Sequence, residues 1–186
     1  FSSRRRHTSS STVSWARSVY KRQDVSCLPG CEGGTIRPNS TVAILGLGFD
    51  PNPPFYVLDK LEADYTHVYL ADPGAKPNFA QKAMEHNKSL LEEFFPDHSK
   101  VIRFPLNSVR VIYQSMQEMI SPYLGKYTIS LIPFGPKPHV LASILLAMKY
   151  PEVSCLYVRS EITRPNEVIP TNEFVCSRVS LTSQPS

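Results

Sequence analysis

Two loops rich in glycine and proline carry the residues best suited to bind a ligand. The first, GLGFDPNPP, begins at Gly46 and contains Asp50, whose carboxylate could act as a general base or cap a turn. The second, PFGPKP, places Lys137 two residues after Gly135. A lysine near a helix start can bind an anion together with the free backbone N–H groups there. The two loops therefore predict a binding site for an anionic small molecule.

The elements that must position these loops alternate between strands and helices. Short apolar runs predict strands at residues 41–46, 67–71, 100–106, 127–132 and 153–159. Apolar residues at helical spacing predict helices at residues 53–63, 78–95, 108–123 and 138–150. Such alternation is typical of a parallel sheet that is covered by helices on both faces.

We expect one Rossmann-like, three-layer α/β domain over residues 41–181, with five parallel strands in the order 3-2-1-4-5. A last alternating run, at 173–181, follows without an intervening helix. It predicts an antiparallel strand at one edge of the sheet. Residues 24–40, rich in Gly, Pro and Ser, are expected to form an irregular lead-in, and residues 182–186 a polar tail.

This topology predicts where a ligand binds. The strand order reverses between the first and fourth strands, and ligands bind outside the carboxyl ends of the strands at such a reversal. The two loops lie side by side there, and the residues that follow the second and fifth strands face the same edge. The predicted binding residues are Gly46, Gly48, Phe49, Asp50, Asp72, Phe134, Gly135, Lys137 and Arg159. The alternative is that the glycines and prolines only form tight turns.

Two resemblances make these expectations more specific. ILGLGFD, at 44–50, resembles the first glycine motif of S-adenosylmethionine-dependent methyltransferases, which would make Asp72 the acid that binds ribose hydroxyls. GPKPHVLASILLA, at 135–147, is similar to the glycine–lysine motif of CARF-type sensors of cyclic oligonucleotides, in which Lys137 would contact phosphate. Three functions thus stay open: a nucleotide-binding, sensor-like module that could form a homodimer, a methyltransferase-like enzyme, and a non-catalytic interaction domain.

Residues 1–23 differ from the rest of the chain. They contain six basic residues and no acidic one, and the whole string resembles a translated sequencing adapter, an artefact of metagenomic gene prediction. We expect a non-native or disordered leader here. The chain has 20 basic and 16 acidic residues, and without these six only 14 basic residues remain. The net charge of +4 therefore does not predict nucleic-acid binding.

The remaining composition predicts a cytoplasmic protein with neither a membrane span nor a metal centre. No stretch contains 18 consecutive apolar residues. Cys27 and Cys31 form a CLPGC pair, but no second close pair or histidine cluster follows, so we expect reduced thiols. Cys155 and Cys176 fall in predicted strands and are expected to pack in the core. His139, at the start of the fourth predicted helix, is expected to face solvent.

Overall fold

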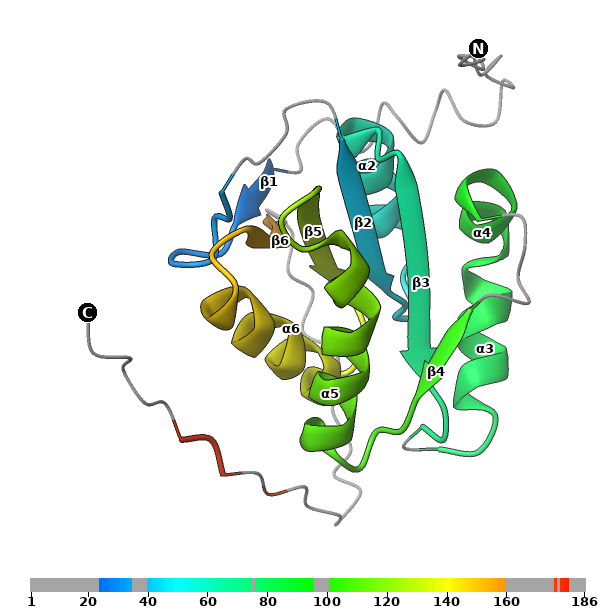
Figure 1. Ribbon diagram of the computed structural model, residues 1–186. Helices are drawn as coiled ribbons and strands as arrows, with labels where there is room; N and C mark the ends of the chain where they lie inside the picture. Colours follow the sequence, from blue (N-terminus) through cyan, green and yellow to red (C-terminus); the bar gives the residue numbers. More distant parts are fainter. Residues whose placement is uncertain are drawn as a thin grey trace.

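A computed structural model describes residues 24–34, 40–74, 76–95, 101–159, 176 and 178–180. In this part of the chain a mainly parallel, six-stranded sheet lies between two layers of helices (Figure 1). The prediction of an α/β fold with a mainly parallel sheet is confirmed. The order of the complete sheet and the identity of its antiparallel strand differ from the prediction.

Five strands are paired in parallel with their neighbours. They are β2 (Thr41–Gly46), β3 (Tyr65–Ala71), β4 (Ile102–Phe104), β5 (Thr128–Pro133) and β6 (Val153–Arg159). The helical segments are α2 (Asn52–Leu61), α3 (Phe79–His86), α4 (Lys88–Phe94), α5 (Val109–Ile120), the short 3-10 helix η3 (Ser121–Tyr123) and α6 (Lys137–Lys149). With the antiparallel strand β1 (Asp24–Cys27), the spatial order is β1-β6-β5-β2-β3-β4.

The antiparallel edge strand is not the one that the sequence predicted. We expected it at 173–181, but the described residues there, Cys176 and 178–180, are exposed and lie in no strand. Instead β1, in the segment expected to be an irregular lead-in, pairs with β6. Its Val25 and Cys27 pack against the core on one face of the sheet. Four residues between loop-forming stretches are too short a pattern to predict a strand, whereas the unpaired backbone edge of β6 favours one.

The predicted helix at 78–95 is divided into α3 and α4 at Asn87. Asn87 is completely buried, and its side-chain amide donates a hydrogen bond to the carbonyl oxygen of Ala83, 2.7 Å away. An asparagine side chain that bonds to nearby carbonyls competes with regular helical hydrogen bonding. The apolar spacing around Asn87 therefore predicted the buried face correctly, but it did not reveal the break.

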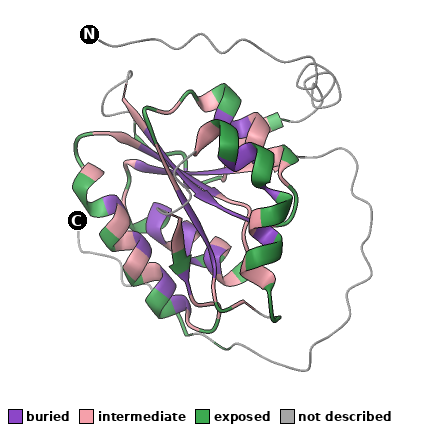
Figure 2. Cartoon of the chain, turned by 90° about the vertical axis from the view of Figure 1, so that its right-hand side faces the viewer, coloured by how far each residue is buried: buried purple, intermediate pink, exposed green. Residues whose placement is uncertain are grey.

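Alternate residues of the central strands face the two helix layers. Val42, Ile44 and Tyr69 point to the α5 and α6 side, whereas Leu45 and Val68 point to the side covered by α2, α3 and α4. Because helices cover both faces, these strands are apolar along almost their whole length. Figure 2 shows the buried strands enclosed by helices whose outer surfaces are exposed.

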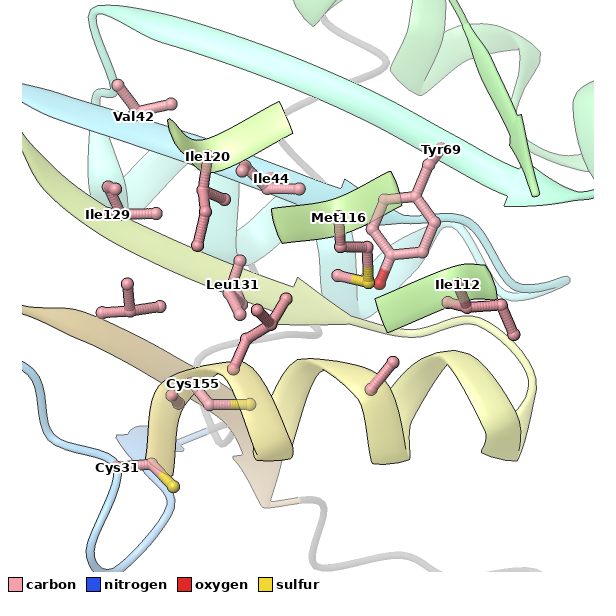
Figure 3. Packing of buried hydrophobic residues seen from close by; sticks show 14 of the residues in the cluster. Cys31, Val42, Ile44, Tyr69, Ile112, Met116, Ile120, Ile129, Leu131 and Cys155 are labelled. Atoms are coloured by element: carbon pink, nitrogen blue, oxygen red, sulfur yellow. The ribbon is translucent and has the colours of Figure 1, made fainter. Parts of the chain in front are cut away.

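The cysteines divide between core and surface. Cys31 and Cys155 join the apolar cluster on the α5 and α6 side (Figure 3). Cys176 is exposed, so the prediction that it packs in the core was wrong. All four cysteines are free thiols. Among the described residues, no group of three or more His, Cys, Asp or Glu side chains could hold a metal ion, and no helix is both long and apolar enough to cross a bilayer.

Candidate ligand-binding site

The carboxyl edge of the sheet brings together the two loops that the sequence singled out. Strand β2 lies between β3 and β5. From β2 the chain first adds β3 and β4 on one side and then returns to add β5 and β6 on the other, so the strand order reverses at β2. The loop after β2 and the loop after β5 are adjacent, and the backbone N–H of Phe134 donates to the carbonyl oxygen of Gly46 at 3.1 Å. The expected proximity of the loops is therefore observed.

The two loops touch each other directly. A Cβ atom on Gly48 would lie 2.2 Å from the carbonyl oxygen of Phe134, and one on Gly135 would lie 3.3 Å from the carbonyl oxygen of Leu47. Glycine at position 48 allows the two backbones to approach more closely than a side chain permits, whereas the contact at position 135 is only slightly tight. The space between Gly48 and Phe134 is consequently occupied by the loops themselves.

Gly46 faces the side chain of Tyr69. A Cβ atom on Gly46 would lie 2.6 Å from the Tyr69 hydroxyl oxygen. That hydroxyl is fully buried and lies 3.3 Å from Oγ of Ser143 on α6. Ser143 Oγ also lies 3.0 Å from the carbonyl oxygen of His139, to which it can donate its single proton. Tyr69 thus fills the space over Gly46 that a cofactor would occupy in the methyltransferase motif.

Burial also explains the ionisation state of Tyr69. Its ring points into the cluster beneath α5 and α6, next to Met116 (Figure 3). Burial raises the pKa of the hydroxyl, and the hydrogen bond with Ser143 opposes this effect. Tyr69 is therefore neutral at ordinary pH.

Phe49 and Asp50 complete the loop after β2. An oxygen of the Asp50 carboxylate accepts a hydrogen bond from the backbone N–H of Asn52 at 3.0 Å, so Asp50 stabilises the turn into α2. Phe49 is 44% exposed, although its backbone is held in place. Its carbonyl oxygen lies 3.2 Å from Nδ1 of His86, and since a carbonyl can only accept, that ring nitrogen carries the proton.

A depression of 540 Å³ opens beside these loops, at the carboxyl ends of β3 and β4. Its volume is within the usual range for small-molecule sites. It is lined by Asp72, Pro73, Gly74, Lys76, Pro77, Asn78, Phe79, Ala80, Gln81 and Arg103. Asp72 and Arg103 form an ion pair within it, and both side chains are exposed to solvent at more than a third of their surface.

The structure divides the predicted binding residues into three groups. Gly46, Gly48, Phe49, Asp50, Phe134 and Gly135 lie in the two touching loops. Lys137 is the exposed first residue of α6, and the side chain of Arg159 lies outside the described part of the chain. Of the predicted residues whose side chains are described, Asp72 alone lines the depression.

Sequence reasoning missed Arg103, Lys76 and Phe79 in the depression. A signal for Arg103 was present: it is a charged residue in an otherwise apolar strand, and that strand was expected to lie beside the one that ends at Asp72. In the sheet, Arg103 is paired with Leu70, two residues before Asp72. Phe79 follows the helical spacing of core residues, and only its position at the start of α3 turns it toward the depression.

His139 does not face solvent as expected but is completely buried. Its ring centroid lies 5.4 Å from that of Tyr69 and 6.2 Å from that of Phe104. Among the described residues, neither ring nitrogen has a hydrogen-bond partner of good geometry. Burial lowers the pKa of His139 to about 4, and the nearby carbonyl of Pro105 offsets this effect only in part. The imidazole is therefore neutral at physiological pH.

Comparison with known proteins assigns no family. A scan against protein-family models finds no match, and a search of curated proteins finds no significant relative. The resemblances to methyltransferases and CARF-type sensors therefore stay predictions, and the function has to be inferred from the geometry at the carboxyl edge of the sheet.

Proposed function

We propose that this domain binds a phosphate-bearing small molecule in the depression at the carboxyl ends of β3 and β4. The observation that carries the proposal is that Lys76, Arg103 and the first turn of α3 line the same hollow. Backbone N–H groups in the first turn of a helix have no partner within the helix, and the helix dipole attracts anions there. In α3 the first of them, Phe79 N–H, donates to the carbonyl oxygen of Lys76 at 3.2 Å, so the groups after Phe79 are the ones that face an anion. Two cationic side chains against one carboxylate leave the described lining with a positive charge.

The contact between the loops after β2 and β5 supports placing the ligand beside them and not between them. Gly48 and Phe134 meet at the backbone, which leaves no room for a phosphate group there. The ligand class is the one expected from the sequence. The binding site, however, lies at the carboxyl ends of β3 and β4 and not between the loops after β2 and β5. The depression still lies outside the carboxyl ends of the strands, the side of an open α/β sheet on which ligands bind.

Arg103 is well suited to exchange partners. Its ion pair with Asp72 is exposed, and such pairs contribute only about 0–1 kcal/mol to stability. A guanidinium group can donate two parallel hydrogen bonds to phosphate oxygens. When Arg103 turns to a phosphate, the Asp72 carboxylate is free to accept hydrogen bonds from hydroxyl groups of the same ligand.

The proposal is tested by calorimetry and thermal denaturation of the chain with inorganic phosphate, ribose 5-phosphate and AMP. A ligand that binds only the folded state raises the melting temperature by mass action. We expect R103A to weaken binding about tenfold, because it removes charge-assisted hydrogen bonds to the phosphate. K126A serves as the matched control, because Lys126 is exposed and lies just before β5, at the amino ends of the strands. This variant should bind the phosphate compounds as the parent chain does. Equal affinities for R103A and K126A would overturn the proposal.

The same experiment distinguishes the proposed phosphate-binding function from the methyltransferase-like alternative. S-adenosylmethionine carries ribose hydroxyls but no phosphate group, so it should stabilise the chain less than AMP does. If S-adenosylmethionine stabilises the chain, the phosphate compounds do not, and D72N removes the effect, the alternative replaces the proposal.

A further inference from the structure

An exposed phenyl ring stands next to the depression. Phe49, in the loop after β2, is 44% exposed, and its ring centroid is 4.8 Å from that of Phe79 in an edge-to-face arrangement. Phe79 is partly exposed and lines the depression. The two rings therefore form one apolar surface, here called the Phe49–Phe79 surface, which extends from the loop after β2 to the wall of the depression.

Contacts from α3 hold this surface in place. Phe79 and His86 are seven residues apart, about two helical turns, and so lie on the same side of α3. The rings of both contact Phe49, with the His86 centroid 5.8 Å from that of Phe49. His86 also binds the carbonyl oxygen of Phe49. The backbone of Phe49 is thus held in place while its ring stays exposed. A ligand that contacts the ring does not have to order the loop first.

A second hydrogen bond holds the residue before Phe49 in place. Nδ2 of Asn87 donates to the carbonyl oxygen of Gly48 at 2.8 Å, and Asn87 is completely buried. Because Asn87 directly follows α3, the loop after β2 and the wall of the depression are joined through the same helix. Phe49 is therefore held beside Phe79 in the wall of the depression by contacts with α3 and with the residue that follows it.

We infer that the depression accepts a phosphate ester that carries a planar aromatic ring, such as a nucleotide, with the ring against the Phe49–Phe79 surface and the phosphate on Arg103 and Lys76. This inference rests on the proposed function and narrows its ligand class. Every nucleobase has a π-face that stacks on aromatic side chains, whereas a sugar phosphate gains little from an apolar ring. Phe79 lines the hollow together with Arg103 and Lys76, and the exposed Phe49 ring packs against Phe79 beside it. This arrangement favours the ring-bearing ligand.

The test compares AMP with ribose 5-phosphate, which lacks the base. We expect the chain to bind AMP about tenfold more tightly, as base–aromatic stacking provides. F49A should abolish most of that preference by weakening AMP binding, and it should change ribose 5-phosphate binding much less. F49L, which keeps an apolar side chain without a π-face, should resemble F49A. Y65A is the control: it removes an aromatic ring that is 50% exposed at the amino end of β3, away from the depression. It should keep the preference for AMP.

The outcomes distinguish the two proposals. If ribose 5-phosphate binds as tightly as AMP, or if F49A weakens both ligands equally, the inference about the ring is overturned while the proposed function stands. If neither compound binds, the proposed function fails and the inference fails with it. Circular dichroism of F49A verifies the fold, which we expect to be intact because Phe49 lies at the surface.

Discussion

The side-chain amide of Asn87 donates a 2.8 Å hydrogen bond to the carbonyl oxygen of Gly48, 39 residues earlier in the chain. The same amide donates to the carbonyl oxygen of Ala83 at 2.7 Å. One buried side chain, at the division between α3 and α4, thus holds the loop at the reversal point of the sheet. The loop conformation therefore depends on α3 as much as on the glycines within the loop.

Replacing Asn87 should destabilise the fold. N87A removes the side-chain donor to the Gly48 carbonyl oxygen, and leaving such a group unpaired costs about 1–3 kcal/mol. The Ala83 carbonyl oxygen keeps the backbone N–H of residue 87 as its partner. Urea denaturation followed by circular dichroism measures the loss. N107A, at an exposed asparagine, is the matched control and should change the free energy of unfolding by less than about 0.5 kcal/mol. Similar losses in both variants would contradict the role assigned to Asn87.

Gly48 should be intolerant of a side chain. G48A places a methyl group 2.2 Å from the carbonyl oxygen of Phe134, so the two loops have to separate. Overpacking of this kind costs about 1–3 kcal/mol. G34A is the control, because its new Cβ meets its nearest neighbour at 3.7 Å, an ordinary contact. The idea that the loops touch is refuted if G48A and G34A have the same denaturation midpoint.

Stability should decrease in mild acid because of His139. Its pKa is about 4 in the folded chain, against roughly 6.5 for an unfolded histidine. Between these values the unfolded state binds a proton that the folded state does not. The free energy of unfolding therefore falls as the pH is lowered from about 6.5 to about 4, by roughly 3 kcal/mol in total.

H139L isolates this effect, because leucine does not titrate. Burial also lowers the pKa of His67, which acts in the same direction in both proteins and so cancels in the comparison. We expect H139L to lose less stability than the parent chain between pH 7 and pH 4.5 in urea denaturation. Parallel pH profiles for the two proteins would show that His139 is already protonated, or accessible, in the folded state.

The thiols should differ in reactivity toward a thiol reagent such as DTNB. Cys176 is exposed and should react rapidly in the native chain. Cys155 is fully buried, and burial raises its pKa to about 12, so it should react only after unfolding. C176S should abolish the rapid phase, and C155S should leave it unchanged. A rapid phase that persists in the double variant C27S/C176S would mean that one of the buried thiols, Cys31 or Cys155, is accessible.

The strands were predictable where the signal was local. The runs at 41–46 and 153–159 were predicted with the bounds that the structure shows for β2 and β6, because apolar stretches ending at glycine, proline or charged residues carry this information themselves. The position of Asp72 at the carboxyl edge was predicted for the same reason. Neither its pairing with Arg103 nor the antiparallel strand β1 followed from a local pattern.

The sequence alone therefore determined the alternation of strands and helices and the edge of the sheet where the glycine-rich loops gather. Periodicity and turn residues act over a few neighbouring positions, so they can be read along the chain. Only the tertiary structure decided that Gly48 meets Phe134, that His139 is buried, and that the hollow lies beside Arg103. Each of these depends on contacts between residues far apart in the sequence, whose distances are set by the packing of whole elements.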